Sequence, residues 1–173
     1  MNLPLVRSTY KTLVKRHGKR NAMSAVHALF SLPLTVREAL TLKTWHIVWS
    51  TYSLYDPSYS NPEAFGFFVD VGNGWSTIIP SVAFSAGLIY GVPPEYTALW
   101  AVVCLCSFYQ MLYGTVIYLL SYIYNKRYEG FGFFEVTAFV AVSNLLWIVF
   151  PTVGMGVCYG VVVTGSLEGV RGV

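Results

Sequence analysis

Three long apolar stretches constrain the fold of this chain more than any other feature of its sequence. They cover residues 64–91, 96–124 and 136–164, and each exceeds the roughly 20 residues that an α-helix needs to cross the hydrocarbon core of a bilayer. The second and third stretches contain no Asp, Glu, Lys or Arg, and Asp70 is the only such residue in the first. Strand-like alternation is absent, and lipid admits only helices or closed barrels. The sequence therefore predicts an all-α, polytopic membrane helix bundle with three long spanning helices.

Composition and length fit this class of protein. The 173 residues are 55% hydrophobic and 11% charged, whereas soluble domains carry about 25% charged residues. A further apolar segment, residues 23–34, is too short to span a bilayer and contains the helix breaker Pro33. We expect one transmembrane domain over residues 23–164, between a basic N-terminal tail (1–22) and a short polar tail (165–173).

The N-terminal tail is strongly basic and contains no acidic residue before Glu38. Its cations are Arg7, Lys11, Lys15, Arg16, Lys19 and Arg20. A nucleic-acid-binding arm is not expected beside three spanning helices, so we interpret the tail as a cytosolic juxtamembrane segment near anionic lipid. A mitochondrial presequence is the alternative. If residues 23–34 do not cross the membrane, the tail and Lys126–Arg127 lie on the same, cytosolic side. If they do cross, the two clusters lie on opposite sides.

The cysteines do not suggest redox or metal chemistry. The chain has an odd number of cysteines, namely Cys104, Cys106 and Cys158. All three lie within apolar stretches and lack a metal-ligand spacing to histidine. We expect them to be small packing residues, and we expect neither a metal site nor a cofactor.

Asp70 is the residue most suggestive of function. A carboxylate at bilayer depth costs at least about 2.5 kcal/mol, so it is normally sheltered inside the helix bundle and functional. Asn73 and Thr77 follow at i+3 and i+7, which puts all three residues on one helical stripe.

Two further polar stripes lie within the other apolar stretches. Gln110 and Tyr113 are three residues apart in the second, and Asn144 and Trp147 are three apart in the third. These stripes predict a shared, partly polar cavity at mid-membrane depth. The alternative is that the amide side chains only hold the helices together by hydrogen bonds. Interhelical hydrogen bonding does not require an acid, so the presence of Asp70 favours a functional cavity over a purely structural role.

Such a cavity would suit proton-transfer chemistry on an apolar molecule. An acid in an apolar pocket can hold and donate a proton near neutral pH. A tryptophan face beside a carboxylate stabilises a cation. The predicted substrate is a sterol or terpenoid alkene that enters from the membrane.

Three ordered motifs, spread from about residue 45 to residue 161, resemble the emopamil-binding protein family, whose members carry the EXPERA domain. The first is a loop with Trp49, Tyr52, Asp56 and Tyr59; the second is a helix with Gln110, Tyr113 and Gly114; the third comprises Glu129-Gly130-Phe131 followed by Asn144, Trp147 and Pro151.

The resemblance implies a multi-pass protein of the endoplasmic reticulum membrane that isomerises a sterol ring double bond, of the sterol Δ8–Δ7 type, without a cofactor. It places Asp70 near a catalytic glutamate and matches His27 to a catalytic histidine. Asn73, Asn144 and Trp147 fall on pocket positions.

The chain also departs from the family pattern. Ser31 stands where the family has a glutamate four residues after the histidine, and the family's first helix and most of its second are missing, as in an N-terminally shortened chain. The alternatives are a binding protein for sterols or cationic amphiphilic amines that lacks turnover, and a terpenoid isomerase or cyclase. A homodimer is left open.

Overall fold

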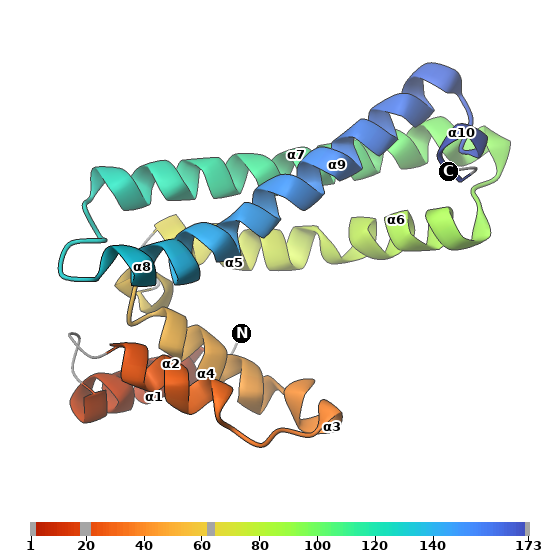
Figure 1. Cartoon of the computed structure of the whole chain (residues 1–173). Helices are drawn as coiled ribbons and strands as arrows, with labels where there is room; N and C mark the ends of the chain where they lie inside the picture. Colours follow the sequence, from red (N-terminus) through yellow and green to blue (C-terminus); the bar gives the residue numbers. More distant parts are fainter. Residues whose placement is uncertain (1–2, 18–21, 62–64, 172–173) are drawn as a thin grey trace. The chain divides into compact units, whose positions relative to one another are not determined.

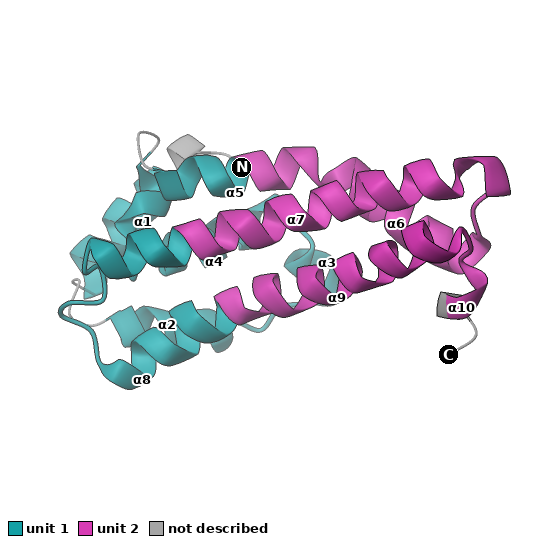
Figure 2. Cartoon of the chain, turned by 90° about the horizontal axis from the view of Figure 1, so that it is seen from above, with its two compact units in different colours: residues 1–71, 118–143 teal, residues 72–117, 144–173 magenta. Residues whose placement is uncertain are grey.

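The computed structural model describes residues 3–17, 22–61 and 65–171, and within these ranges the regular structure is entirely helical (Figure 1). The predicted all-α class is confirmed. The chain divides into two compact units (Figure 2). Unit 1 comprises Met1–Val71 and Tyr118–Ser143, and unit 2 comprises Gly72–Ile117 and Asn144–Val173. Each unit is described by itself.

Four helices form the N-terminal part of unit 1. They are α1 (Leu3–His17), α2 (Ala22–Phe30), α3 (Val36–Ala39) and α4 (Leu42–Tyr52). The segment expected to be a basic tail thus folds as a helix, and α1 packs against α4 and α2. Helix α2 has nine residues and ends before Pro33, so it is too short to cross a bilayer.

Side-chain caps at Thr35 and Thr41 mark the starts of α3 and α4 and so make them two separate helices. Thr35 and Glu38 form a capping box, in which the Glu38 carboxylate accepts from the Thr35 amide at 2.9 Å. Thr41 caps α4 by accepting from the Thr44 amide. Each cap satisfies amide donors that have no partner within the helix, so each starts a helix of its own.

The first predicted span is not a continuous helix. It is divided into α5 (Phe65–Ser76, 12 residues) and α6 (Ile78–Tyr90, 13 residues), which meet at Thr77. Pro80 explains the interruption, because a proline has no N–H to bond the carbonyl of Ser76 and its ring clashes with that carbonyl. Neither piece alone reaches the roughly 20 residues of a spanning helix. Of the three long spanning helices that we predicted, two are therefore found as helices long enough to cross a membrane.

The two long helices match the second and third apolar stretches. One is α7 (Pro94–Tyr124, 31 residues). The other runs over 32 residues, Phe133–Thr164, and consists of α8 (Phe133–Glu135), the π-helix η3 (Val136–Ala141) and α9 (Val142–Thr164). Both are long and apolar enough to cross a membrane. Only 28% and 22% of their most apolar windows is buried, whereas the core helix of a soluble protein is mostly buried.

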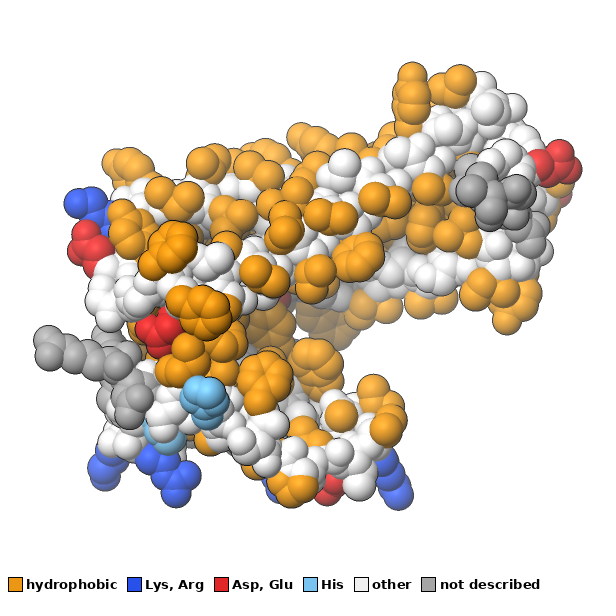
Figure 3. All heavy atoms as spheres, in the orientation of Figure 1, with side chains coloured by type: hydrophobic (Ala, Val, Ile, Leu, Met, Phe, Trp, Pro, Cys, Tyr) orange, Lys and Arg blue, Asp and Glu red, His pale blue; other side chains and the backbone are white. Residues whose placement is uncertain are grey.

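Small residues let aromatic rings lie close to the helices of unit 2. A Cβ atom on Gly87 of α6 would lie 2.6 Å from the Trp100 indole of α7, and one on Gly154 of α9 would lie 2.5 Å from the Phe108 ring. Large apolar side chains on α6, α7 and α9 point outward, and hydrophobic atoms cover much of the visible face of these helices (Figure 3). Close contacts at small residues inside and apolar side chains outside are typical of helices packed in lipid.

Candidate functional site

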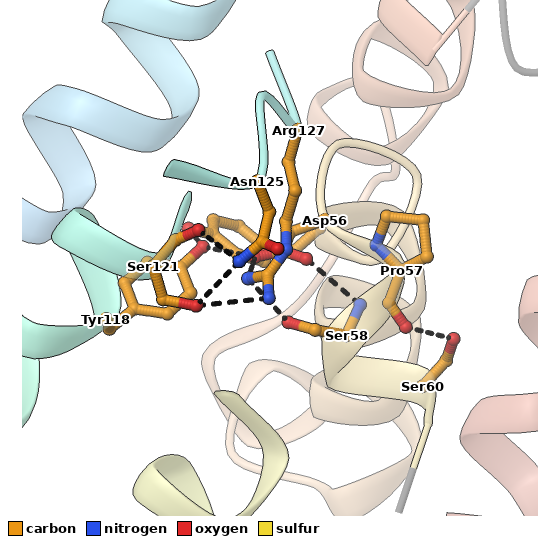
Figure 4. A network of polar contacts seen from close by, with 9 residues as sticks. Asp56, Pro57, Ser58, Ser60, Tyr118, Ser121, Asn125 and Arg127 are labelled. Carbon is orange, nitrogen blue, oxygen red and sulfur yellow. Dashed lines mark hydrogen bonds and ion pairs between the residues drawn. The ribbon is translucent and has the colours of Figure 1, made fainter. Parts of the chain in front are cut away.

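Asp56 is the centre of a buried polar network in unit 1 (Figure 4). It precedes the short 3₁₀ helix η2 (Pro57–Ser60), and its side chain is fully buried. Its Oδ1 accepts from the Ser58 amide at 2.9 Å, and its Oδ2 accepts from the Tyr118 hydroxyl at 2.7 Å. Nη1 of Arg127 donates to the same Oδ2 at 3.2 Å and neutralises the carboxylate. A buried charge needs this degree of pairing and hydrogen bonding.

Arg127 ties the loop after α7 to this network. Besides Asp56, it donates to the Ser58 hydroxyl at 3.4 Å and to the Ser121 hydroxyl at 3.2 Å. Asn125 donates to the Ser121 carbonyl at 2.7 Å (Figure 4). The guanidinium fork therefore contacts the loop before α5 and the last turns of α7 together.

Stacked aromatic rings surround the network. Tyr59 stacks on Trp49 with ring centroids 5.6 Å apart, and it meets Tyr52 and Tyr118 edge-on at 5.0 and 5.4 Å. The hydroxyls of Tyr52 and Tyr118 are 3.2 Å apart. Burial raises the pKa of Tyr59, and the charges on Tyr52, Asp70 and Asp56 raise it further. The loop motif thus builds a packed core in this chain, not an open cavity.

Tyr55 belongs to a second aromatic group of the same core. Its side chain is buried, and its ring lies 5.1 Å from that of Phe131 and 5.4 Å from that of Phe139. Burial raises the pKa of Tyr55, and the nearby Glu135 carboxylate raises it further. Beside this group, an open depression of about 320 Å³ is lined by Leu54, Pro57, Lys126, Arg127, Glu129, Gly130 and Phe131.

In unit 2 the structure brings together two of the predicted site residues. Nε2 of Gln110 on α7 donates to Oδ1 of Asn73 on α5 at 3.1 Å and also contacts the Ser76 hydroxyl. The Thr77 hydroxyl is buried and donates to the Asn73 carbonyl at 2.6 Å. The Thr77 hydroxyl therefore satisfies a backbone carbonyl at the end of α5. Of the three predicted residues, only Asn73 and Gln110 are joined by a side-chain hydrogen bond between helices.

The other predicted residues of unit 2 differ in exposure. Asn144 on α9 is buried, whereas the side chains of Trp147 and Tyr113 are about half exposed, at 52% and 55%. The Tyr113 ring stacks on that of Tyr109 one turn earlier, with centroids 6.0 Å apart.

The two predicted catalytic residues lie in unit 1. Asp70 is half-buried on α5, where its charge acts on Tyr59. His27 lies on α2 with an exposed side chain, so it is not in a buried proton-transfer site. Asp70 and His27 belong to unit 1, and the six predicted binding residues belong to unit 2.

The cysteines and acids of the described ranges do not assemble a metal site. No three His, Cys, Asp or Glu side chains gather there as ligands. All three cysteines are free; Cys104 and Cys158 are buried and Cys106 is exposed.

Sequence reasoning missed the partners of Asp56. Tyr118 is separated from Asp56 by 62 residues and Arg127 by 71, so no local pattern links them. The available signal was one acid in an aromatic loop and one arginine in the connection after the second apolar stretch.

Comparisons of the chain with protein-family models, with curated proteins and with solved structures find no match.

Proposed function

We propose that this chain is a multi-pass protein of the endoplasmic reticulum membrane that binds a sterol or terpenoid lipid and shifts a ring double bond with Asp70. The observation that carries the proposal is the arrangement of α5. Asp70 and Asn73 lie one turn apart on this apolar helix, and the Asn73 side chain is held by Gln110. An acid next to a fixed amide, on helices with apolar outer faces, suits a lipid substrate with one reactive group.

The proposed reaction needs only proton transfer. The protonated Asp70 carboxyl donates its proton to one alkene carbon, the π electrons form the new C–H bond, and a carbocation remains at the other carbon. The Asp70 carboxylate and the amide dipole of Asn73 stabilise this cation. Loss of a proton from a neighbouring carbon to the carboxylate forms the shifted double bond and restores the acid. No atom is gained or lost overall.

Product analysis of the full-length chain in lipid nanodiscs tests this proposal. A Δ8 sterol and a terpenoid alkene are incubated in deuterated water with wild type, Asp70→Asn and Glu95→Gln. Glu95 is a matched control, because it is an acid in the exposed first turn of α7. We expect wild type and Glu95→Gln to form a shifted, deuterium-labelled product, and Asp70→Asn to lose at least about 100-fold in rate. Equal turnover in Asp70→Asn would contradict the proposed role.

Binding without turnover is the second candidate. It is favoured by the exposure of His27 and by Ser31 in the position where the resemblance calls for a glutamate. In that case, sterols and cationic amphiphilic amines would bind to wild type while no deuterium entered the sterol. A deuterium-labelled product formed by wild type and not by Asp70→Asn would exclude it.

A further inference from the structure

Helix α1 has two different faces. Val6 is fully buried, and Tyr10, Leu13 and Val14 pack against the hydrophobic core of unit 1. The opposite face carries Lys11, Lys15 and Arg16 with exposed side chains. The spacing of these residues, four and five apart, keeps the cations on one side of the helix.

The apolar face of α1 is already occupied within unit 1. The Ser50 hydroxyl of α4 donates to the Val6 carbonyl at 3.2 Å, and Arg7 Nε donates to the Ser60 carbonyl at 3.0 Å. At the other end of the helix, His17 Nδ1 lies 3.2 Å from the Ser24 hydroxyl of α2. Among the described side chains of α1, from Val6 to His17, no apolar stripe is left free to insert between lipid chains, so this part of the helix meets a membrane through its charges.

Within the part of the chain that the structure describes, the exposed cations of α1 have no acidic partners. Helix α1 contains no Asp or Glu, and the ion pairs found among the described residues, Lys126–Glu129 and Arg127–Asp56, do not involve α1. Blue Lys and Arg side chains gather along the edge of unit 1 formed by α1 to α4 (Figure 3). Unpaired cations of this kind are free to bind an external anion.

The charge distribution indicates which side of a membrane unit 1 occupies. Of the eleven Lys and Arg residues, ten lie in the sequence ranges of unit 1, because only Arg171 lies in unit 2. The loop after α7, with Lys126 and Arg127, belongs to the same unit as α1. Positive charge in short loops and juxtamembrane segments favours the cytosolic side, where the leaflet is rich in anionic lipid.

We propose that the Lys11, Lys15 and Arg16 face of α1 binds the anionic headgroups of the cytosolic leaflet, as a peripheral electrostatic contact made without insertion. Each cation near such a surface strengthens binding about fivefold. The attraction acts over about 8 Å at physiological salt and weakens as salt increases. This role does not depend on turnover by Asp70.

Lipid enrichment in nanodiscs tests the proposal. The full chain is placed in phosphatidylcholine that contains a minor fraction of phosphatidylserine, and energy transfer from tryptophan to a dansyl label is compared for the two lipids. We expect wild type to enrich the labelled phosphatidylserine at low salt. The triple variant Lys11→Gln, Lys15→Gln, Arg16→Gln should lower this enrichment by about tenfold or more.

Two matched controls separate charge from structure. Lys11→Arg with Lys15→Arg keeps the charge and should retain the enrichment. Thr12→Ala, an exposed neutral change on the same helix, should also retain it. The proposal is overturned if the triple variant enriches phosphatidylserine as wild type does, if high salt leaves wild-type enrichment unchanged, or if soluble phosphoserine displaces the lipid label at matched concentration.

Discussion

Arg127 reaches across 71 residues of sequence to place Nη1 3.2 Å from Oδ2 of Asp56. The carboxylate is fully buried, and the arginine side chain is 20% exposed. Since the same carboxylate oxygen also accepts from Tyr118, this pair connects the loop before α5, the end of α7 and the loop after it. The pair therefore stabilises a junction of three segments in unit 1.

Replacement of Asp56 by Asn should destabilise the protein by about 2–4 kcal/mol, because Arg127 would keep its charge without a counter-charge. The measurement is the free energy of unfolding in detergent micelles, followed by tryptophan fluorescence. Lys126→Ala is the matched control, since it removes an exposed ion pair to Glu129 and should cost less than about 0.5 kcal/mol. A loss for Asp56→Asn as small as that of the control would contradict the assigned role.

Gly87→Ala should destabilise unit 2 by about 1–3 kcal/mol through overpacking. The new Cβ would lie 2.6 Å from the Trp100 ring. That ring cannot easily move, because Nε1 donates to the Ala83 carbonyl at 2.7 Å and the ring stacks on Phe84. Thermal unfolding by circular dichroism measures the change.

The control for this substitution is Gly156→Ala on α9, where nothing lies within 4 Å of the new atom. Alanine has a higher helix propensity than glycine, so this variant should gain about 0.5–1 kcal/mol. Stabilisation of both variants would show that Gly87 does not set the distance between α6 and the Trp100 ring.

The amide pair Gln110–Asn73 should show a measurable coupling energy. In a double-mutant cycle with Gln110→Ala and Asn73→Ala, we expect an interaction of about 0.6 kcal/mol, and at most about 1.7 kcal/mol, typical of hydrogen bonds between helices in lipid. A cycle between Gln110 and Thr152, whose hydroxyl donates to its own helix, is the reference and should give no coupling. Equal coupling in both cycles would disprove a specific bond.

Stability should fall at alkaline pH because of Tyr55 and Tyr59. Burial raises the pKa of both phenols in the folded state, so the native protein keeps protons that the unfolded chain loses above about pH 10. Their contribution is fully present below the unfolded pKa and is lost as pH rises toward the folded pKa. Tyr55→Phe should make the decline less steep, as measured by unfolding between neutral pH and the alkaline transition together with phenolate absorbance. An unchanged slope would contradict the shift at Tyr55.

The helices could be predicted to different degrees from the sequence. The uncharged stretches over residues 96–124 and 136–164 correspond closely to α7 and to the helix Phe133–Thr164, because composition alone specifies such segments. The break at Thr77 had a visible signal in Pro80. The capping box at Thr35 and Glu38 had one too, a Thr followed three residues later by a Glu.

The candidate site was less predictable, because its contacts join distant segments. Spacing put Asn73 and Gln110 on polar stripes, and they do form a hydrogen bond. The same reasoning gave Thr77 a binding role, whereas its hydroxyl is used by the backbone of its own helix. The partners of Asp56 depend on tertiary packing that no periodicity encodes. Catalysis by Asp70 and His27 stays a prediction.

The π-helical turn η3 affects how the side chains of α9 are positioned around the helix axis. A π-helix closes its hydrogen bonds across five residues instead of four, which is equivalent to one residue inserted into an α-helix. Ser143 accommodates the widened turn by donating to the carbonyls of Phe139 and Val140. Deletion of one residue within Val136–Ala141 would restore the ordinary pitch and leave each later side chain near its present angle around the axis, whereas a deletion within a regular α-helix would rotate each later side chain by about 100°. One codon can therefore be lost at this turn while Asn144 keeps its buried position on α9.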